Sequence, residues 1–189
     1  MRTATRRDEL VRVAYKQLAE RGFEGLRTRD VAAAAGVNVA TLHYYFPTKE
    51  SLIRGVLEHA MSRFRTTLEP SGSPADQLRN HLRAVRKLMA GEPELAAVMG
   101  ELAMRAYRDE PVRAIVNEMF ATWQAAMRGL LRRAAREGKL RSEMDSDATA
   151  ALIMGTLMAA NLAPMTDSRR GEQAVRQLER LLGISGSSN

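Results

Sequence analysis

Apolar residues recur every three to four positions along most of the chain, which is the spacing of amphipathic helices. Leu10, Val13, Ala14 and Leu18 share one face of a first helix, expected from about Thr5 to Gly22. A longer stripe predicts a helix of about six turns, and its apolar positions are Val112, Ile115, Val116, Met119, Phe120, Trp123, Met127, Leu130, Leu131 and Ala134. No segment gives a convincing strand. The pattern therefore predicts an all-α protein of about nine helices.

Turn-forming residues fall between these apolar runs. The clearest linker is Pro70-Ser71-Gly72-Ser73-Pro74. Ser73 can cap the next helix, Pro74 suits its first position, and Asp76 completes a capping box. Further breaks at Gly91, Pro111, Gly138 and Pro164 separate the remaining helices.

Charge and composition narrow the classes of protein. Across 189 residues, 29 Lys and Arg exceed 22 Asp and Glu, and the formal net charge of +7 suits an anionic partner. The basic residues are interleaved with acidic ones, unlike a polybasic membrane face, and no apolar stretch approaches the roughly 20 residues of a membrane span. We therefore expect a cytoplasmic protein without a membrane partner.

The sequence shows no arrangement of residues that is typical of an enzyme. Cysteine is absent, which excludes thiol chemistry and disulfides, and the three histidines are scattered. We find no Gly-rich phosphate loop, no Ser/His/Asp set and no paired carboxylates. The sequence thus predicts no catalytic residue, no cofactor and no metal site.

Residues 27–50, RTRDVAAAAGVNVATLHYYFPTKE, carry the clearest functional signal. Thr28 can cap a short alanine-rich helix, and Gly36 stands where that helix would end in a left-handed conformation. Asn38 can then cap a second short helix over about residues 39–45. Two short helices joined by a tight glycine turn form a helix-turn-helix, whose second helix is expected to enter the major groove of DNA.

The composition of that second helix is unusual for a structural one. Leu42 and Phe46 are four residues apart and can anchor the helix to a core. The side chains next to and between these two residues cannot all be buried. Exposed aromatic residues beside a hydroxyl suit phosphate contacts, and the residues concerned are Thr41, His43, Tyr44 and Tyr45.

Lys49 and Arg29 both break a local rule. Thr48 is expected to cap a fourth helix that runs to about Glu69, so Lys49 falls in its first turn. Arg29 takes the same place in the second helix. A cation there opposes the helix dipole, and residues that break such a rule are candidates for function. A helix N-terminus with a lysine can hold a phosphate.

These residues resemble the TetR family of one-component transcriptional regulators, over a stretch from about Arg6 to Leu57. The shared pattern comprises the alanine-rich second helix, Ala35-Gly36-Val37, the polar cap Asn38, Ala40-Thr41-Leu42, an aromatic pair, Phe46 and Lys49-Glu50. His43 stands where the family usually has tyrosine, and Tyr45 where histidine is common. These two exchanges leave the base contacts open.

The resemblance implies a role for each exposed residue of the motif. It implies contacts with DNA phosphates for Thr28, Thr41, Tyr44, Tyr45 and Lys49. It implies contacts with base edges for Arg29, Val39, Ala40 and His43. Arg29 can grip guanine at O6 and N7, whereas Val39 and Ala40 can read only thymine methyl groups or shape. Two alternatives stay open: His43 as an ordinary surface histidine, and Arg2, Arg6 and Arg7 as a solvated tail instead of a DNA-tracking arm.

The family's C-terminal helices form a ligand pocket and a dimer face, and the apolar pattern here agrees. Residues 148–163 are apolar nearly all round, so their helix must be buried on several sides. The last helix has an apolar face of Val175, Leu178, Leu181 and Leu182. One chain alone would leave a large exposed patch, so we expect a homodimer with a four-helix seam and two recognition helices for a pseudo-palindromic operator.

Methionine is frequent, with 11 residues, and it suits adaptable binding surfaces. For any single methionine, core filling is the simpler interpretation. As a set they predict a mostly apolar ligand pocket, with the candidates Met99, Phe120, Trp123, Met127, Met158 and Asn161. Glu101, Arg105 and Tyr107 could add polarity, although a solvated helix face suits the first two better.

Two functional hypotheses follow. The first is a homodimeric repressor that a small-molecule effector releases from a double-stranded DNA operator, with a DNA-binding domain at 1–50 and an effector-binding and dimerisation domain at 51–189. The second is a DNA-binding protein of the same fold with no small-molecule effector, architectural or regulated by a partner. Repression is the common mode in the family; the residues themselves do not separate it from activation.

Overall fold

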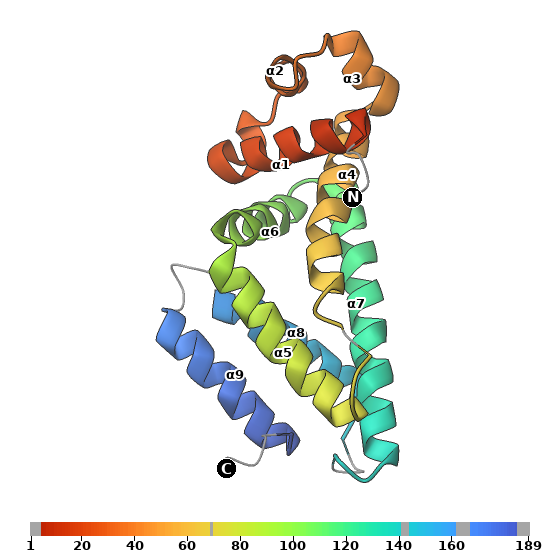
Figure 1. Cartoon of the computed structure of the whole chain (residues 1–189), viewed down its shortest axis with the longest axis vertical. Coiled ribbons are helices and arrows are strands. Elements are labelled where there is room, and N and C mark those ends of the chain that lie inside the picture. Colours follow the sequence, from red (N-terminus) through yellow and green to blue (C-terminus); the bar gives the residue numbers. More distant parts are fainter. Residues whose placement is uncertain (1–4, 69, 141–143, 162–166, 185–189) are drawn as a thin grey trace. The chain divides into compact units, whose positions relative to one another are not determined.

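The computed structural model describes residues 5–68, 70–140, 144–161 and 167–184 (Figure 1). Within these ranges the chain forms nine α-helices and no strand, as the apolar spacing predicts. The chain divides into two compact units. Helices α4 (Lys49–Arg65) and α7 (Glu110–Arg136) contribute to both units. Among the helices described, none is long and apolar enough to span a bilayer.

The first unit contains the described residues up to Arg63 together with Pro93–Glu118. Its helices besides the first part of α4 and the start of α7 are α1 (Arg6–Gly25), α2 (Thr28–Ala34), α3 (Val39–Tyr45) and α6 (Pro93–Ala106). Helix α1 packs on α2 and, most extensively, on α6. The segment that carries α6 therefore shares a core with the helix-turn-helix. The predicted division at residue 50 is a division by function and stays a prediction.

The second unit contains Phe64–Glu92 and the described residues from Met119 onward. Helix α5 (Pro74–Gly91) packs against α8 (Ser146–Asn161) and α9 (Ser168–Leu182), which also pack on each other. Leu78, Leu82 and Val85 are buried on one face of α5, as its helical spacing requires. On α9, Glu179 is 3% exposed and binds Arg83 through two hydrogen bonds of 2.8 and 2.7 Å.

Most of the predicted helix ends are confirmed. The Ser73 hydroxyl accepts from the Asp76 backbone N–H, and Asp76 returns the bond, so the capping box is present with Pro74 in the first turn. A second capping box begins α1, from Thr5 and Asp8. Helix α4 ends at Arg65, earlier than the expected Glu69.

A buried hydrogen-bond chain crosses the core of the second unit. Trp123 Nε1–H donates to His81 Nε2 at 2.9 Å, so His81 Nδ1 carries the other proton and faces the Thr67 hydroxyl at 2.8 Å. That hydroxyl donates to the Phe64 carbonyl at 2.6 Å. His81 is completely buried, and burial lowers its pKa from 6.5 to about 4. These hydrogen bonds thus connect the turn after α4 to α5 and α7 through a neutral histidine.

Candidate nucleic-acid interface

The turn between α2 and α3 has the geometry that its sequence predicts. Gly36 adopts φ +66°, a conformation that glycine takes without a Cβ penalty. The N–H of Gly36 donates to the Ala33 carbonyl, and that of Val37 to the Ala32 carbonyl, which closes the end of α2 as a Schellman motif. Asn38 Oδ1 accepts from the Thr41 N–H at 2.8 Å and caps α3. Together these contacts fix the angle between the two short helices.

Helix α3 is held by its apolar side and presents the opposite side to solvent. Leu42 is fully buried, and Phe46, directly after the helix, is 1% exposed. Tyr44 is 81% exposed and Tyr45 36%, with their rings edge to face at 5.1 Å. The remaining predicted contacts on α3 are exposed or half-buried: Val39, Ala40, Thr41 and His43. The exposed face is therefore short, polar and aromatic.

Two details of the predicted phosphate contacts differ from expectation. Thr28 is the first residue of α2 and not its cap, because Arg27 holds the cap position without a side-chain hydrogen bond. The Thr41 hydroxyl donates to Asn38 Oδ1 at 2.9 Å, so it must turn away before it can donate to a phosphate.

Arg29 is exposed on the first turn of α2. Arg6 and Arg7 belong to α1, so they are not part of a free arm.

Lys49 stands at the start of α4, where Thr48 caps the helix through a 3.1 Å bond from the Ser51 N–H. Its Nζ lies 4.2 Å from the centre of the Phe23 ring and 3.4 Å from the Phe23 carbonyl oxygen. Burial lowers the pKa of Lys49 below its usual value, and Glu24 acts in the opposite direction. The side chain is thus held against α1.

The same phenylalanine is contacted from α6. The Arg105 guanidinium lies 4.1 Å from the centre of the Phe23 ring, and Glu101 Oε1 accepts the Phe23 backbone N–H at 2.7 Å. Gly22 makes this approach possible: it adopts φ +68°, and a Cβ there would lie 3.2 Å from Glu101 Oε1. The expectation of a solvated face for Glu101 and Arg105 is therefore wrong.

Two further carboxylates hold Arg105. It donates to Asp109 at 3.0 Å and to Glu24 at 2.7 Å. Asp109 in turn accepts the N–H of Val112 in the first turn of α7. We call Phe23, Lys49, Glu101 and Arg105 the Phe23 clamp. The clamp connects α1, α4 and α6 within the first unit.

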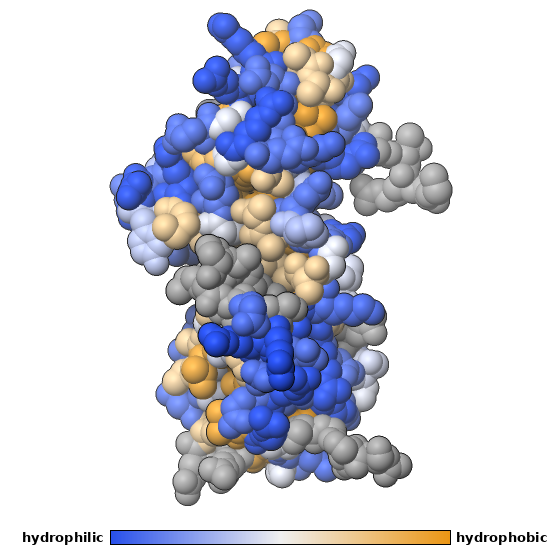
Figure 2. Space-filling model, turned by 90° about the vertical axis from the view of Figure 1, so that its left-hand side faces the viewer, coloured by the Kyte–Doolittle hydropathy of each residue, from blue (hydrophilic) through white to orange (hydrophobic). Residues whose placement is uncertain are grey.

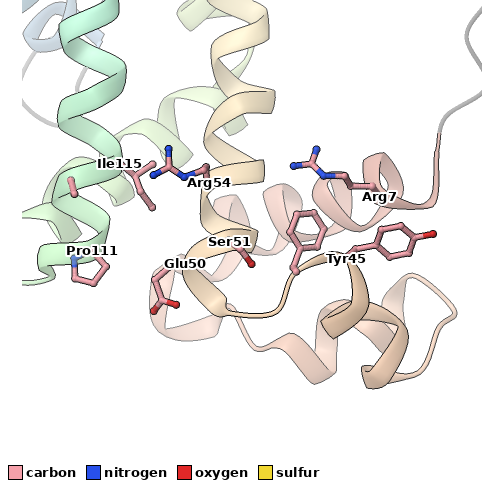
Figure 3. A pocket seen from close by; sticks show the side chains of 9 residues that line it. Arg7, Tyr45, Glu50, Ser51, Arg54, Pro111 and Ile115 are labelled. Carbon is pink, nitrogen blue, oxygen red and sulfur yellow. The ribbon is translucent and has the colours of Figure 1, made fainter.

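A groove of about 490 Å³ lies beside α3 within the first unit (Figure 3). Its two guanidinium groups are already paired, Arg7 with Glu58 at 3.3 Å and Arg54 with Glu118 at 2.7 Å. Their charge is thus balanced locally, and Glu50 adds a further negative charge. The lining residues are Arg7, Tyr45, Phe46, Glu50, Ser51, Arg54, Pro111, Ala114 and Ile115.

The groove shares no residue with the set of residues predicted to line a ligand pocket. Trp123 and Met127 are buried in the second unit, where Phe120 and Met158 are half-buried. Met99 is buried in the first unit, and the side chain of Asn161 lies outside the described residues. The structure brings Phe120 and Trp123 together, with ring centres 6.2 Å apart. The pocket as a whole stays a prediction.

A helix-turn-helix of this kind, on a scaffold whose described elements are all helices, defines a class of DNA-binding transcriptional regulators. The sequence matches two family profiles: "Bacterial regulatory proteins, tetR family" over residues 10–56, and "Tetracyclin repressor-like, C-terminal domain" over residues 68–178. The chain belongs to the TetR family, whose members are transcriptional regulators and not enzymes.

Relatives and solved structures agree with this assignment. The transcriptional repressor KstR2 of Rhodococcus jostii is 27% identical over 82% of this chain and 78% of its own length. The fatty acid metabolism regulator protein of Bacillus subtilis is 24% identical over 79% and 78% of the two chains. A TetR-family regulator from Rhodococcus sp. superimposes with a TM-score of 0.83 at 22% identity, over 94% of this chain and 98% of that one.

Proposed function

We propose that this chain is a homodimeric repressor that binds an operator through α3 and releases it when a small, mostly apolar ligand binds. The observation that carries the proposal is the exposed polar and aromatic face of α3, which is anchored by Leu42 and oriented by the Gly36 turn. The repressors and metabolic regulators among its relatives support the same mode of action.

The proposed contacts divide the exposed residues by chemistry. Hydroxyl and ammonium groups donate to phosphate oxygens and set the register of the helix on the duplex; these are Thr28, Thr41, Tyr44, Tyr45 and Lys49. Base edges in the major groove are read by Arg29, Val39, Ala40 and His43. Of these, Arg29 is the residue with a bidentate partner, guanine.

Substituting Lys49 by alanine should weaken binding to all duplexes by a similar factor and flatten the salt dependence by about one unit of slope. The reason is that one phosphate contact, and the counterion it displaces, is lost. The measurement is fluorescence anisotropy with a specific and a scrambled duplex at several salt concentrations. Lys139→Ala, an exposed lysine of the second unit, provides the charge-matched control. Unchanged affinity and slope in Lys49→Ala would show that Lys49 has no phosphate contact.

The proposal of a dimer rests on apolar surface in the second unit. Leu152 on α8 is 57% exposed and Leu181 on α9 is 63% exposed. Small residues beside Leu152 are exposed as well and allow close helix approach: Ala148, Ala151, Gly155 and Ala159. Figure 2 shows hydrophobic surface gathered in patches between larger hydrophilic areas. Sedimentation at twice the chain mass of 21.0 kDa is expected, and a monomer at micromolar concentration would refute the dimer.

The effector is proposed to prefer a dimer in which the recognition helices no longer match half-sites about 34–36 Å apart. The pocket residues we assign to it are Met99, Phe120, Trp123, Met127, Met158 and Asn161. A screen of apolar acids and sterols for release of bound operator tests this part. A protein without an effector would keep its operator in every case.

A further inference from the structure

The Phe23 clamp places two cations on one buried ring, although like charges repel each other. Phe23 is 5% exposed, with Lys49 Nζ and the Arg105 guanidinium 4.2 and 4.1 Å from its ring centre. Because both groups are positively charged, their repulsion opposes this arrangement, and the contacts with the ring must offset it. Such contacts draw their energy from the negative face of the ring and grow stronger as they lose water.

The clamp leaves Lys49 only partly engaged. An ammonium group has three N–H donors and no acceptor. Among the described residues it has one hydrogen bond, the 3.4 Å contact to the Phe23 carbonyl. Arg105, by contrast, is bound to Asp109 and Glu24 as well as to the ring. Arg105 is therefore fixed by several partners, whereas Lys49 keeps donors that can reach a phosphate.

From this difference we infer that Phe23 and Arg105 are positioning residues: Arg105 fixes the Phe23 ring, and the ring holds the Lys49 ammonium at the start of α4 for a DNA phosphate. A lysine that is already ordered loses less side-chain entropy when it binds, so the contact gains affinity. The inference rests on the proposed DNA-binding function. It extends that function to α6, a helix remote in sequence from the helix-turn-helix.

The clamp also depends on the backbone at Gly22. Because Gly22 has a positive φ, the next N–H points to Glu101, which lies on α6. This bond places the Phe23 ring under both cations. The sequence of contacts therefore runs from Gly22 through Glu101 to Phe23 and then to Lys49.

The test is a double-mutant cycle on operator affinity with Phe23→Leu, Lys49→Ala and the combined variant. Phe23→Leu removes the ring face without changing any charge. We expect it to weaken binding by about 3- to 10-fold, the usual cost of ordering one long side chain on binding. Lys49→Ala should have a smaller effect once Phe23 is leucine, because the phosphate contact that it removes is already weakened.

Two controls separate positioning from a loss of stability. Phe64→Leu makes the same substitution at a 4% exposed site of the second unit and should leave the Lys49→Ala effect intact. Arg105→Gln should reproduce the Phe23→Leu result, whereas Arg113→Gln removes the same charge from an exposed pair with Glu110 and should not. If Phe23→Leu fails to fold, the comparison of Arg105→Gln with Arg113→Gln tests the positioning role in its place.

A second readout needs no DNA. Ring currents should shift the Lys49 ε-methylene protons upfield in the NMR spectrum of the wild type, and Phe23→Leu should abolish the shift. Additive effects of Phe23→Leu and Lys49→Ala, with normal wild-type binding, would overturn the positioning role alone. A wild type that binds no duplex would overturn the proposed function and this inference with it.

Discussion

Replacing Phe46 by alanine should lower the free energy of unfolding of the first unit by about 3–5 kcal/mol. Phe46 follows the recognition helix directly and is 1% exposed. Its ring packs so closely on α4 that a Cβ added to Gly55 would meet it at 3.0 Å. Alanine leaves a cavity beneath α3 and α4, and such a loss is a large part of the roughly 5–15 kcal/mol that stabilises a whole protein.

Loss of Phe46 should also abolish operator binding, since the ring anchors the end of α3. Urea denaturation followed by circular dichroism measures the stability, and hydrogen exchange over residues 28–46 locates the loss. Phe120→Ala, at a half-buried position of the second unit, should cost less and leave exchange in the first unit unchanged. A Phe46→Ala variant within about 1 kcal/mol of wild type would mean that α3 is not anchored through this ring.

Acidification is expected to destabilise the second unit through His81. Burial lowers the pKa of His81 to about 4, against 6.5 for the ordinary side chain. As the pH falls through this window, the unfolded chain binds a proton that the folded chain excludes, so the free energy of unfolding decreases. The total loss is about 3 kcal/mol when pH 4 is reached. Well above pH 6.5 His81 is neutral in both states, and the contribution stays constant.

The physical cause is the acceptor role of His81 Nε2, which receives the Trp123 N–H. Protonation would remove that acceptor and place a charge in the core. Urea unfolding of the wild type and of His81→Gln between pH 7 and pH 4.5 isolates the effect, because the two proteins share every other titratable group and their contributions cancel in the difference. The variant should be less stable at pH 7 but should lose less on acidification. If the free energies of unfolding of the two proteins fell in parallel with pH, His81 would not be the group responsible.

Local signals in the sequence were sufficient for the helix-turn-helix. Gly36, Asn38 and the spacing of Leu42 and Phe46 act within one or two helical turns, and the structure confirms the turn, the cap and both buried positions. Thr28 is the exception. A threonine one residue inside a helix looks in sequence like one at its cap, and Arg27 offers no competing signal.

Contacts between distant residues were not predictable in the same way. Phe23 and Glu101 are 78 residues apart, and no pattern in either segment predicts a contact between them. The sequence therefore favours a solvated face for Glu101 and Arg105, and it does not predict the packing of α6 on α1. His81 carried a usable signal, because it lies on the face of α5 that also carries Leu78, Leu82 and Val85, where a polar residue needs a partner.

Selection of bound duplexes from a random-sequence pool, at low ionic strength, tests DNA recognition by α3 most directly. The predicted result is an enriched pseudo-palindrome with half-sites one helical turn, or a multiple of it, apart. Arg29→Ala should select the same motif with one position per half-site degenerate, a loss of about 1–3 kcal/mol of discrimination at that position. If the wild type enriches no sequence, or if Arg29→Ala selects an identical motif, sequence readout through this surface is contradicted.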